Sequence, residues 1–317
     1  MTYEQKIEYV KNYLQRRLEE EFVYPFKVYY EDRRFVFSMK SGKTECCART
    51  RNAHEMIHTI LCESDAEKEI LVNRLFVLLQ AAVNAQDSTV LAEITDYEKI
   101  RSDLILRPLC YRTVREELKN VPHIRMGDIA LALYAVMAHV GNDYFTAKIH
   151  RAQMAQWKRN ESLVLEEALI NTSFLYPPRL YSMEDLLNWD EKSSEDGVFM
   201  GANPRVRLHG EIKGLVLTNT LELNGAIALF YPGVAERIAN GFDSNFYIGF
   251  TSIHEAQIHP VDMIDPEVIR ESLKETNRLC NKKEDILSGK VYLYDRDRRC
   301  FVMLVDGGYK EVYWNVR

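Results

Sequence analysis

The sequence feature that most constrains the fold is an uninterrupted apolar run, IALALYAVM, at residues 129–137. Successive side chains of a strand point to opposite faces of its sheet, so a run that is apolar at every position fits a strand buried on both faces. We therefore expect a strand near 128–137 in the middle of a sheet.

Apolar residues recur at helical or alternating spacing along the rest of the chain. Pro25 places the first strand of an early β-meander at a sheet edge, and Asp265 followed by Pro266 is typical of a helix start. The expected helices cover residues 3–20, 52–62, 66–85, 112–119, 161–172, 233–240 and 266–280. The other expected strands lie near 22–30, 35–39, 44–49, 104–110, 145–150, 214–219, 225–230, 245–250, 253–259, 290–294, 299–305 and 310–314.

These elements predict an α+β protein with mixed or antiparallel sheets, flanking helices and two lobes. Residues 190–212 are polar, contain glycine and are interrupted by Pro204, as is typical of a linker. We expect an N-terminal α+β region at 1–190, this linker, and a C-terminal α+β domain at 213–317.

The composition narrows the cellular setting and the partners. The formal net charge is -6 and no basic stripe stands out, so nucleic acid is not an expected partner. The six cysteines form no C-x-x-C pattern, the N-terminus has no signal-peptide core, and no apolar run is long enough for a membrane span. We expect a soluble cytoplasmic protein with free thiols and no membrane partner.

The one formal catalytic motif is H-E-M-I-H at residues 54–58. On a helix, His54 and His58 share one face and could both bind zinc, with Glu55 activating a metal-bound water. The H-x-x-G-x-x-H continuation is absent, and Arg49 and Arg51 bring positive charge to the start of the helix. We favour an ordinary helix with two incidental histidines and no cofactor, and zinc is the alternative.

A second candidate site contains Ser252, His254, Glu255 and His259. If 253–259 is a strand, His254 points to one face while Glu255 and His259 share the other. Glu255 and His259 would then be about 13 Å apart, too far to bond without a bend or bulge. A direct role in function and a role in capping the strand both remain open.

A third candidate lies immediately before the apolar run. His123 and Asp128 could form an acid–base couple, and Arg125 could bind a carboxylate or phosphate through two parallel hydrogen bonds. The structural alternative is a local salt bridge and cap at the start of a central strand.

Several phrases of the sequence resemble an uncharacterised bacterial family built on a domain of unknown function. They are NVPHIRMGDIALALY at 120–134, IHRAQMAQW at 149–157, EEALINTSFLYPP at 166–178, GLVLTNTLELNGAIALFYPGV at 214–234, YIGFTSIHE at 247–255 and YLYDR at 292–296. The resemblance covers about residues 95–305 and implies no known activity, ligand or catalytic residue.

Well-specified helices and strands, together with the lack of a complete catalytic motif, favour a non-enzymatic binding or interaction protein. The sequence does not specify its partner, and another protein is one candidate. One alternative is a zinc-dependent hydrolase that uses His54, Glu55 and His58. Another is a small-ligand sensor with His123, Arg125 or His254 in a cleft.

Overall fold

The structure is a computed structural model that describes most of the chain. Residues outside this description are 22–25, 32–33, 42–43, 50–52, 85–95, 141–142, 183–197, 200–213, 280, 282, 306–307 and 313–317. Contacts divide the chain into two units. Unit 1 comprises Met1–Asp96 and Val136–Ala147, and unit 2 comprises Tyr97–Ala135 and Lys148–Arg317.

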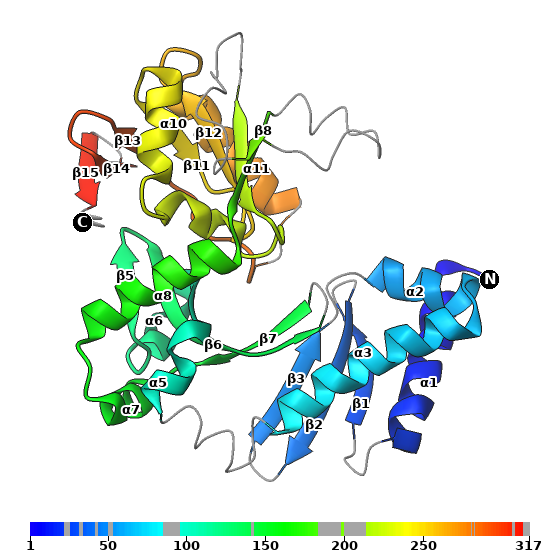
Figure 1. The fold of residues 1–317 in the computed structure, drawn as a ribbon. Helices are drawn as coiled ribbons and strands as arrows, with labels where there is room; N and C mark the ends of the chain where they lie inside the picture. Colours follow the sequence, from blue (N-terminus) through cyan, green and yellow to red (C-terminus); the bar gives the residue numbers. More distant parts are fainter. Residues whose placement is uncertain are drawn as a thin grey trace. The chain divides into compact units, whose positions relative to one another are not determined.

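Both units contain helices and strands (Figure 1). In chain order they are α1 (Tyr3–Glu21), β1 (Phe26–Glu31), β2 (Arg34–Ser41), β3 (Thr44–Arg49), α2 (Ala53–Cys62), α3 (Asp65–Asn84), α5 (Tyr97–Ile100), η1 (Arg101–Asp103), β4 (Leu104–Cys110), α6 (Tyr111–Leu118), β5 (His123–Met126), β6 (Ile129–Val140), β7 (Asp143–Lys148), α7 (Arg151–Met154), η2 (Ala155–Trp157), α8 (Glu161–Leu175), β8 (Pro178–Ser182), β9 (Val198–Phe199), β10 (Leu215–Asn219), η3 (Gly225–Phe230), α10 (Val234–Phe242), β11 (Phe246–Gly249), β12 (Ala256–Pro260), α11 (Pro266–Leu279), β13 (Val291–Asp295), β14 (Cys300–Val305) and β15 (Gly308–Val312).

Unit 1 packs three helices against a three-stranded antiparallel sheet of order β1-β2-β3. Val10, Leu14 and Leu18 lie one helical turn apart on α1 and form its buried face. They share a core with Phe35 and Phe37 of β2 and with apolar residues of α2 and α3. The expected edge position of the first strand is confirmed, although Pro25 itself lies outside the described residues.

Unit 2 begins with a sheet of order β4-β6-β5. The end of β6, from Val136, and β7 up to Ala147 belong to unit 1, and β7 pairs with β6. β6 is therefore central, as its apolar sequence predicts, and Ile129 to Val136 are all buried. Helix α8 packs on β4 with Val164, Ala168 and Leu169 buried. The hydroxyl of Thr172 on α8 accepts a 2.9 Å hydrogen bond from the Leu106 N–H of β4, which fixes the helix to the strand.

The second sheet of unit 2 has eight strands in the order β15-β14-β13-β11-β12-β10-β8-β9. Val291 and Leu304 pack with Ile269 and Leu273 of α11 on one face. Tyr292 follows Val291 and so points to the opposite face, where η3 and α10 also contribute to the core. The aromatic core on that second face includes Tyr292, Phe250, Phe230, Phe301, Phe246 and Tyr294.

The β5–β6 hairpin carries a buried carboxylate that ties the two sheets of unit 2 together. Asp128 is 6 % exposed, and its Oδ1 accepts hydrogen bonds from Tyr292 Oη at 2.5 Å and Ser288 Oγ at 2.9 Å. Burial, followed by the nearby Asp128 charge, raises the pKa of Tyr292, so its hydroxyl stays protonated and able to donate. The preceding Gly127 has a φ of +58°, and a Cβ there would lie 2.8 Å from Tyr292 Oη.

The α+β class is confirmed, since helices accompany sheets in both units and every strand pair with a described register is antiparallel. The two-lobed division with a linker at 190–212 stays a prediction, because only Val198–Phe199 of that segment is described. β8 precedes the expected linker and β10 follows it, and the two strands pair directly.

The expected strand at 225–230 is wrong, because these residues form the 3-10 helix η3. Asn224 adopts a left-handed conformation with a φ of 54°, and the Ala226 N–H donates to the Ile253 carbonyl of another loop. All six residues of η3 are buried, and a short run that is apolar throughout fits a buried helix as well as a buried strand.

Gly225 allows η3 to approach β10 and the 250–255 loop closely. A Cβ at this position would lie 2.1 Å from Thr218 Oγ1 and 2.4 Å from the His254 carbonyl oxygen. We predict that Gly225→Ala lowers the free energy of unfolding by about 3 kcal/mol, as expected for an overpacked core. The matched control Gly289→Ala, where a Cβ meets nothing within 4 Å, should stay within about 0.5 kcal/mol. Equal losses in urea denaturation would contradict the close packing.

Candidate functional site

The H-E-M-I-H motif lies on α2 in unit 1, as expected. The His54 and His58 side chains are both exposed, and the Glu55 side chain lies outside the described part of the structure. His58 Nδ1 lies 3.3 Å from Glu63 Oε1, on the same helix end. Among described residues, no three His, Cys, Asp or Glu side chains are grouped so that they could hold a metal ion. Zinc at this motif stays the alternative to an ordinary helix with two incidental histidines, and elemental analysis of the wild type and His58→Ala tests it.

Loops from three parts of the chain meet at one end of the eight-stranded sheet in unit 2. Gly249, the last residue of β11, pairs with Val291 of β13 and Gln257 of β12, while Leu217 of β10 pairs with Ala256. Residues 220–225, 250–255, 281 and 283–290 therefore gather at this end, and they are named the loop cluster here. Convergence of loops on a rigid sheet is typical of functional sites.

His254 lies in the loop cluster with both ring nitrogens facing protein groups. Its Nδ1 accepts a 3.1 Å hydrogen bond from the backbone N–H of Asn224, so the proton of the neutral ring is on Nε2. Nε2 lies 3.6 Å from Asp285 Oδ1, and the His254 side chain is only 24 % exposed. A general base needs an open nitrogen within reach of its substrate, whereas this ring connects two loops.

The expected strand at 253–259 starts later than predicted, at Ala256. The backbone N–H of His254 donates to Ser252 Oγ at 3.0 Å, and that of Ile253 donates to the Asp285 carbonyl at 2.8 Å. In this loop the backbone N–H groups bond to Ser252 and Asp285 and not to a neighbouring strand. His254 and Glu255 therefore lie in the loop before β12. Ser252, His254 and Asp285 have the composition of a catalytic triad, but Ser252 Oγ bonds the backbone of His254 and not its ring.

The other members of the second candidate group are also built into the protein. The Thr251 hydroxyl donates to Glu255 Oε1 at 2.9 Å. His259 lies within β12 and is 5 % exposed. The structure thus brings His254 and Glu255 into the loop cluster and places His259 in the sheet. The arrangement orders loops more readily than it binds a substrate.

The third candidate group is split between two places on the β5–β6 hairpin. Asp128 bonds Tyr292 and Ser288 in the interior, rather than His123. His123 Nδ1 lies 2.8 Å from the Val121 carbonyl, to which it donates, and its ring lies beside Tyr111 at a centroid distance of 6.2 Å. Arg125 is exposed on β5, with its guanidinium carbon 3.9 Å from the Tyr111 ring centroid.

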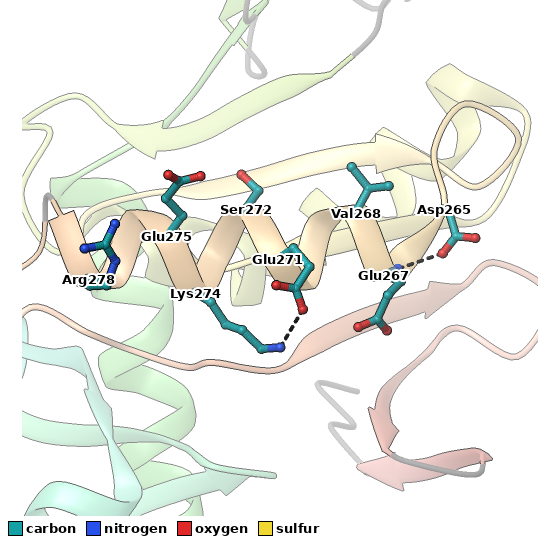
Figure 2. Close-up of a pocket in the computed structure, with 8 residues that line it drawn as sticks. All are labelled: Asp265, Glu267, Val268, Glu271, Ser272, Lys274, Glu275 and Arg278. Carbon is teal, nitrogen blue, oxygen red and sulfur yellow. Dashed lines mark hydrogen bonds and ion pairs between the residues drawn. The ribbon is translucent and has the colours of Figure 1, made fainter.

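A shallow groove runs along the outer side of α11. Figure 2 shows its lining residues, all of which come from α11 and the residue that caps it, Asp265. Lys274 bonds Glu271, and Asp265 accepts from the Glu267 N–H at 2.8 Å as the predicted N-cap. Charges of both signs alternate along a single helix here, and no second described element contributes a side chain to a binding site.

Helix α8 exposes an apolar stripe that the sequence analysis does not identify. Leu163, Ile170 and Phe174 are 64 %, 44 % and 79 % exposed, and they lie opposite the buried face that packs on β4. Their spacing of seven and four residues places them on one side of a helix. Apolar residues thus lie on both sides of α8, which is unusual for a helix with one side in water. This pattern of apolar residues on all sides of the helix is the feature of the sequence that could have indicated an exposed apolar stripe.

Carboxylates flank this stripe on both sides. Glu167 accepts from Tyr97 Oη at 2.5 Å and from Arg101, and these bonds, Tyr97 first, lower its pKa. Burial is the main cause that raises the pKa of Tyr97 to about 12, followed by its bond to Glu167. Glu166, on the other flank, is exposed and forms no ion pair with any described residue.

The sequence matches a family described as a family of unknown function, DUF5688, over residues 50–296. The chain belongs to this family. The match begins just before α2 of unit 1 and continues through β13 of unit 2, so it includes α8, the β5–β6 hairpin and the loop cluster. No curated protein and no solved structure matches the chain. None of the described helices is long and apolar enough to cross a membrane.

His254 supports the loop cluster by accepting the N–H of Asn224, a residue that is 4 % exposed. We predict that His254→Ala lowers the free energy of unfolding by about 1–3 kcal/mol, because it leaves a buried donor without its acceptor. His254→Asn places an oxygen near the Nδ1 position and should recover part of this loss. The measurement is chemical denaturation of both variants, and equal destabilisation would show that the accepted bond is not what matters.

Proposed function

We propose that this protein is a non-enzymatic binding protein that engages another protein through the outer face of α8. The observation that carries the proposal is the exposed stripe of Leu163, Ile170 and Phe174. Exposed apolar side chains grouped on one face are typical of interaction sites. The contacts of His254 and Asp128 are in keeping with this proposal, since His254 Nδ1 and Asp128 Oδ1 already accept hydrogen bonds within the protein.

The chemistry around the stripe favours an amphipathic helix as the partner. From Leu163 to Phe174 the stripe extends about 16 Å along the helix axis, a length suited to helix-on-helix packing. Glu166 borders it as an exposed carboxylate without an ion pair among the described residues. The partner helix should therefore carry leucine-like residues on one face and a lysine or arginine beside them.

The cellular setting is also part of the proposal. Cys62 and Cys110 are free thiols, as a reducing compartment favours. We place the protein in a bacterial cytoplasm, in line with the resemblance of its sequence to bacterial proteins.

Phe174→Asp tests the docking face, because Phe174 is 79 % exposed and its loss should leave the fold intact. The probe is a fluorescent amphipathic helical peptide with a leucine face and flanking lysines, followed by fluorescence polarisation. We predict saturable binding to the wild type and at least about tenfold weaker binding to Phe174→Asp, since buried aromatic anchors dominate interfaces. Val268→Asp, at a 56 % exposed apolar residue of α11, is the matched control and should bind as the wild type does.

Two outcomes would contradict the proposal. Equal binding of the lysine peptide and a glutamate-flanked version would exclude the role assigned to Glu166. Sedimentation showing a wild-type dimer that Phe174→Asp converts to a monomer would show that a second copy of this chain covers the stripe, in place of another protein.

A further inference from the structure

The guanidinium of Arg125 is held in a fixed position at the surface of unit 2. Its Nε donates to the Gly127 carbonyl at 3.0 Å, across the turn of the β5–β6 hairpin. Its guanidinium carbon lies 3.9 Å from the ring centroid of Tyr111, the first residue of α6. An arginine stacked on an aromatic ring and bonded through Nε has lost much of its freedom before any ligand arrives. Its two terminal NH₂ groups remain as a fork of donors.

The helix that supplies Tyr111 also carries arginines that form no ion pair with a described residue. Arg112 and Arg115 follow Tyr111 on α6, and both are exposed. Neither they nor Arg125 forms an ion pair with a described residue. The carboxylates of the same helix, Glu116 and Glu117, are already bonded to Lys119 and Lys148. Because the chain has a net charge of -6, a local group of arginines without ion pairs is stronger evidence for an anion site than it would be on a basic protein.

Two further features favour an anion at this place. The Asp128 carbonyl accepts the Tyr111 N–H, but the other first-turn N–H groups of α6 add partial positive charge, and its N-cap, Cys110, makes no side-chain capping bond. His123 packs on the same Tyr111 ring, and its Nδ1 proton is committed to the Val121 carbonyl. Only Nε2 of His123 is left to face a ligand.

We propose that Arg125, positioned by Tyr111 and Gly127, is a binding site for the carboxylate or phosphate group of an acidic ligand. The planar fork of arginine matches the paired oxygens of both groups and binds them through two parallel hydrogen bonds. Arg112 and Arg115 attract the anion to the site, and Arg125 binds it. The site is separate from the α8 stripe and does not depend on a protein partner.

The test is a titration of the full chain at low ionic strength, followed by two-dimensional NMR, with inorganic phosphate in one series and acetate in the other. We expect saturable shifts at the amides of Tyr111, Arg125 and Gly127. Arg125→Lys keeps the charge but lacks the fork, and it should bind at least about tenfold more weakly. Arg237→Lys changes an exposed arginine of α10 and should bind as the wild type does.

Saturation by phosphate alone would assign a phosphate group to the ligand, and saturation by acetate alone would assign a carboxylate. Saturation by both would support the shared oxyanion chemistry. No saturable shift with either anion would overturn the proposal, and so would equal affinity in the wild type and Arg125→Lys. The melting temperatures of both variants check that the fold is retained.

Discussion

The rest of unit 2 depends on the hydrogen bonds that the buried Asp128 carboxylate accepts from Tyr292 and Ser288. An ionised carboxylate is costly to bury unless donors surround it. Tyr292 and Ser288 supply those donors from the region of β13, and Gly127 allows the hairpin backbone to approach Tyr292 Oη. Asp128 is 160 positions from Ser288 and 164 positions from Tyr292 in the sequence, so the three residues can meet only when both sheets of unit 2 have formed.

The surfaces proposed for binding are held by the same part of the fold. The Asp128 carbonyl accepts a 2.8 Å hydrogen bond from the Tyr111 N–H, which sets the start of α6 and places the ring on which Arg125 stacks. β6 follows Asp128 and pairs with β4, and β4 in turn bonds Thr172 of α8. Buried polar bonds thus position two exposed surfaces, one apolar on α8 and one cationic beside α6.

Local patterns in the sequence predict much of this fold. The apolar run of β6 predicts a central strand, and Asp265–Pro266 predicts the start of α11, because both signals depend on neighbours along the chain. η3 could not be predicted in this way, since its helical path depends on contacts of Gly225 with Thr218 and His254. Distant contacts also decide what the candidate residues do. His123 and Asp128 are close in sequence, but they do not bond each other. His123 bonds the nearby Val121 carbonyl, whereas Asp128 bonds Tyr292 and Ser288 from a distant part of the chain. The sequence does not predict the α8 stripe, because α8 is apolar on all sides. Only its packing on β4 decides which side is buried and which side is exposed.

The most direct test of this account is a double-mutant cycle between Asp128→Asn and Tyr292→Phe, with the free energy of unfolding as the quantity measured. If the buried hydrogen bond braces unit 2, each single variant is destabilised and the two losses are not additive, with a coupling of about 1 kcal/mol or more. Ser288→Ala extends the cycle to the second donor. Additive effects, or single variants as stable as the wild type, would contradict the claim that Asp128 holds the two sheets of unit 2 together.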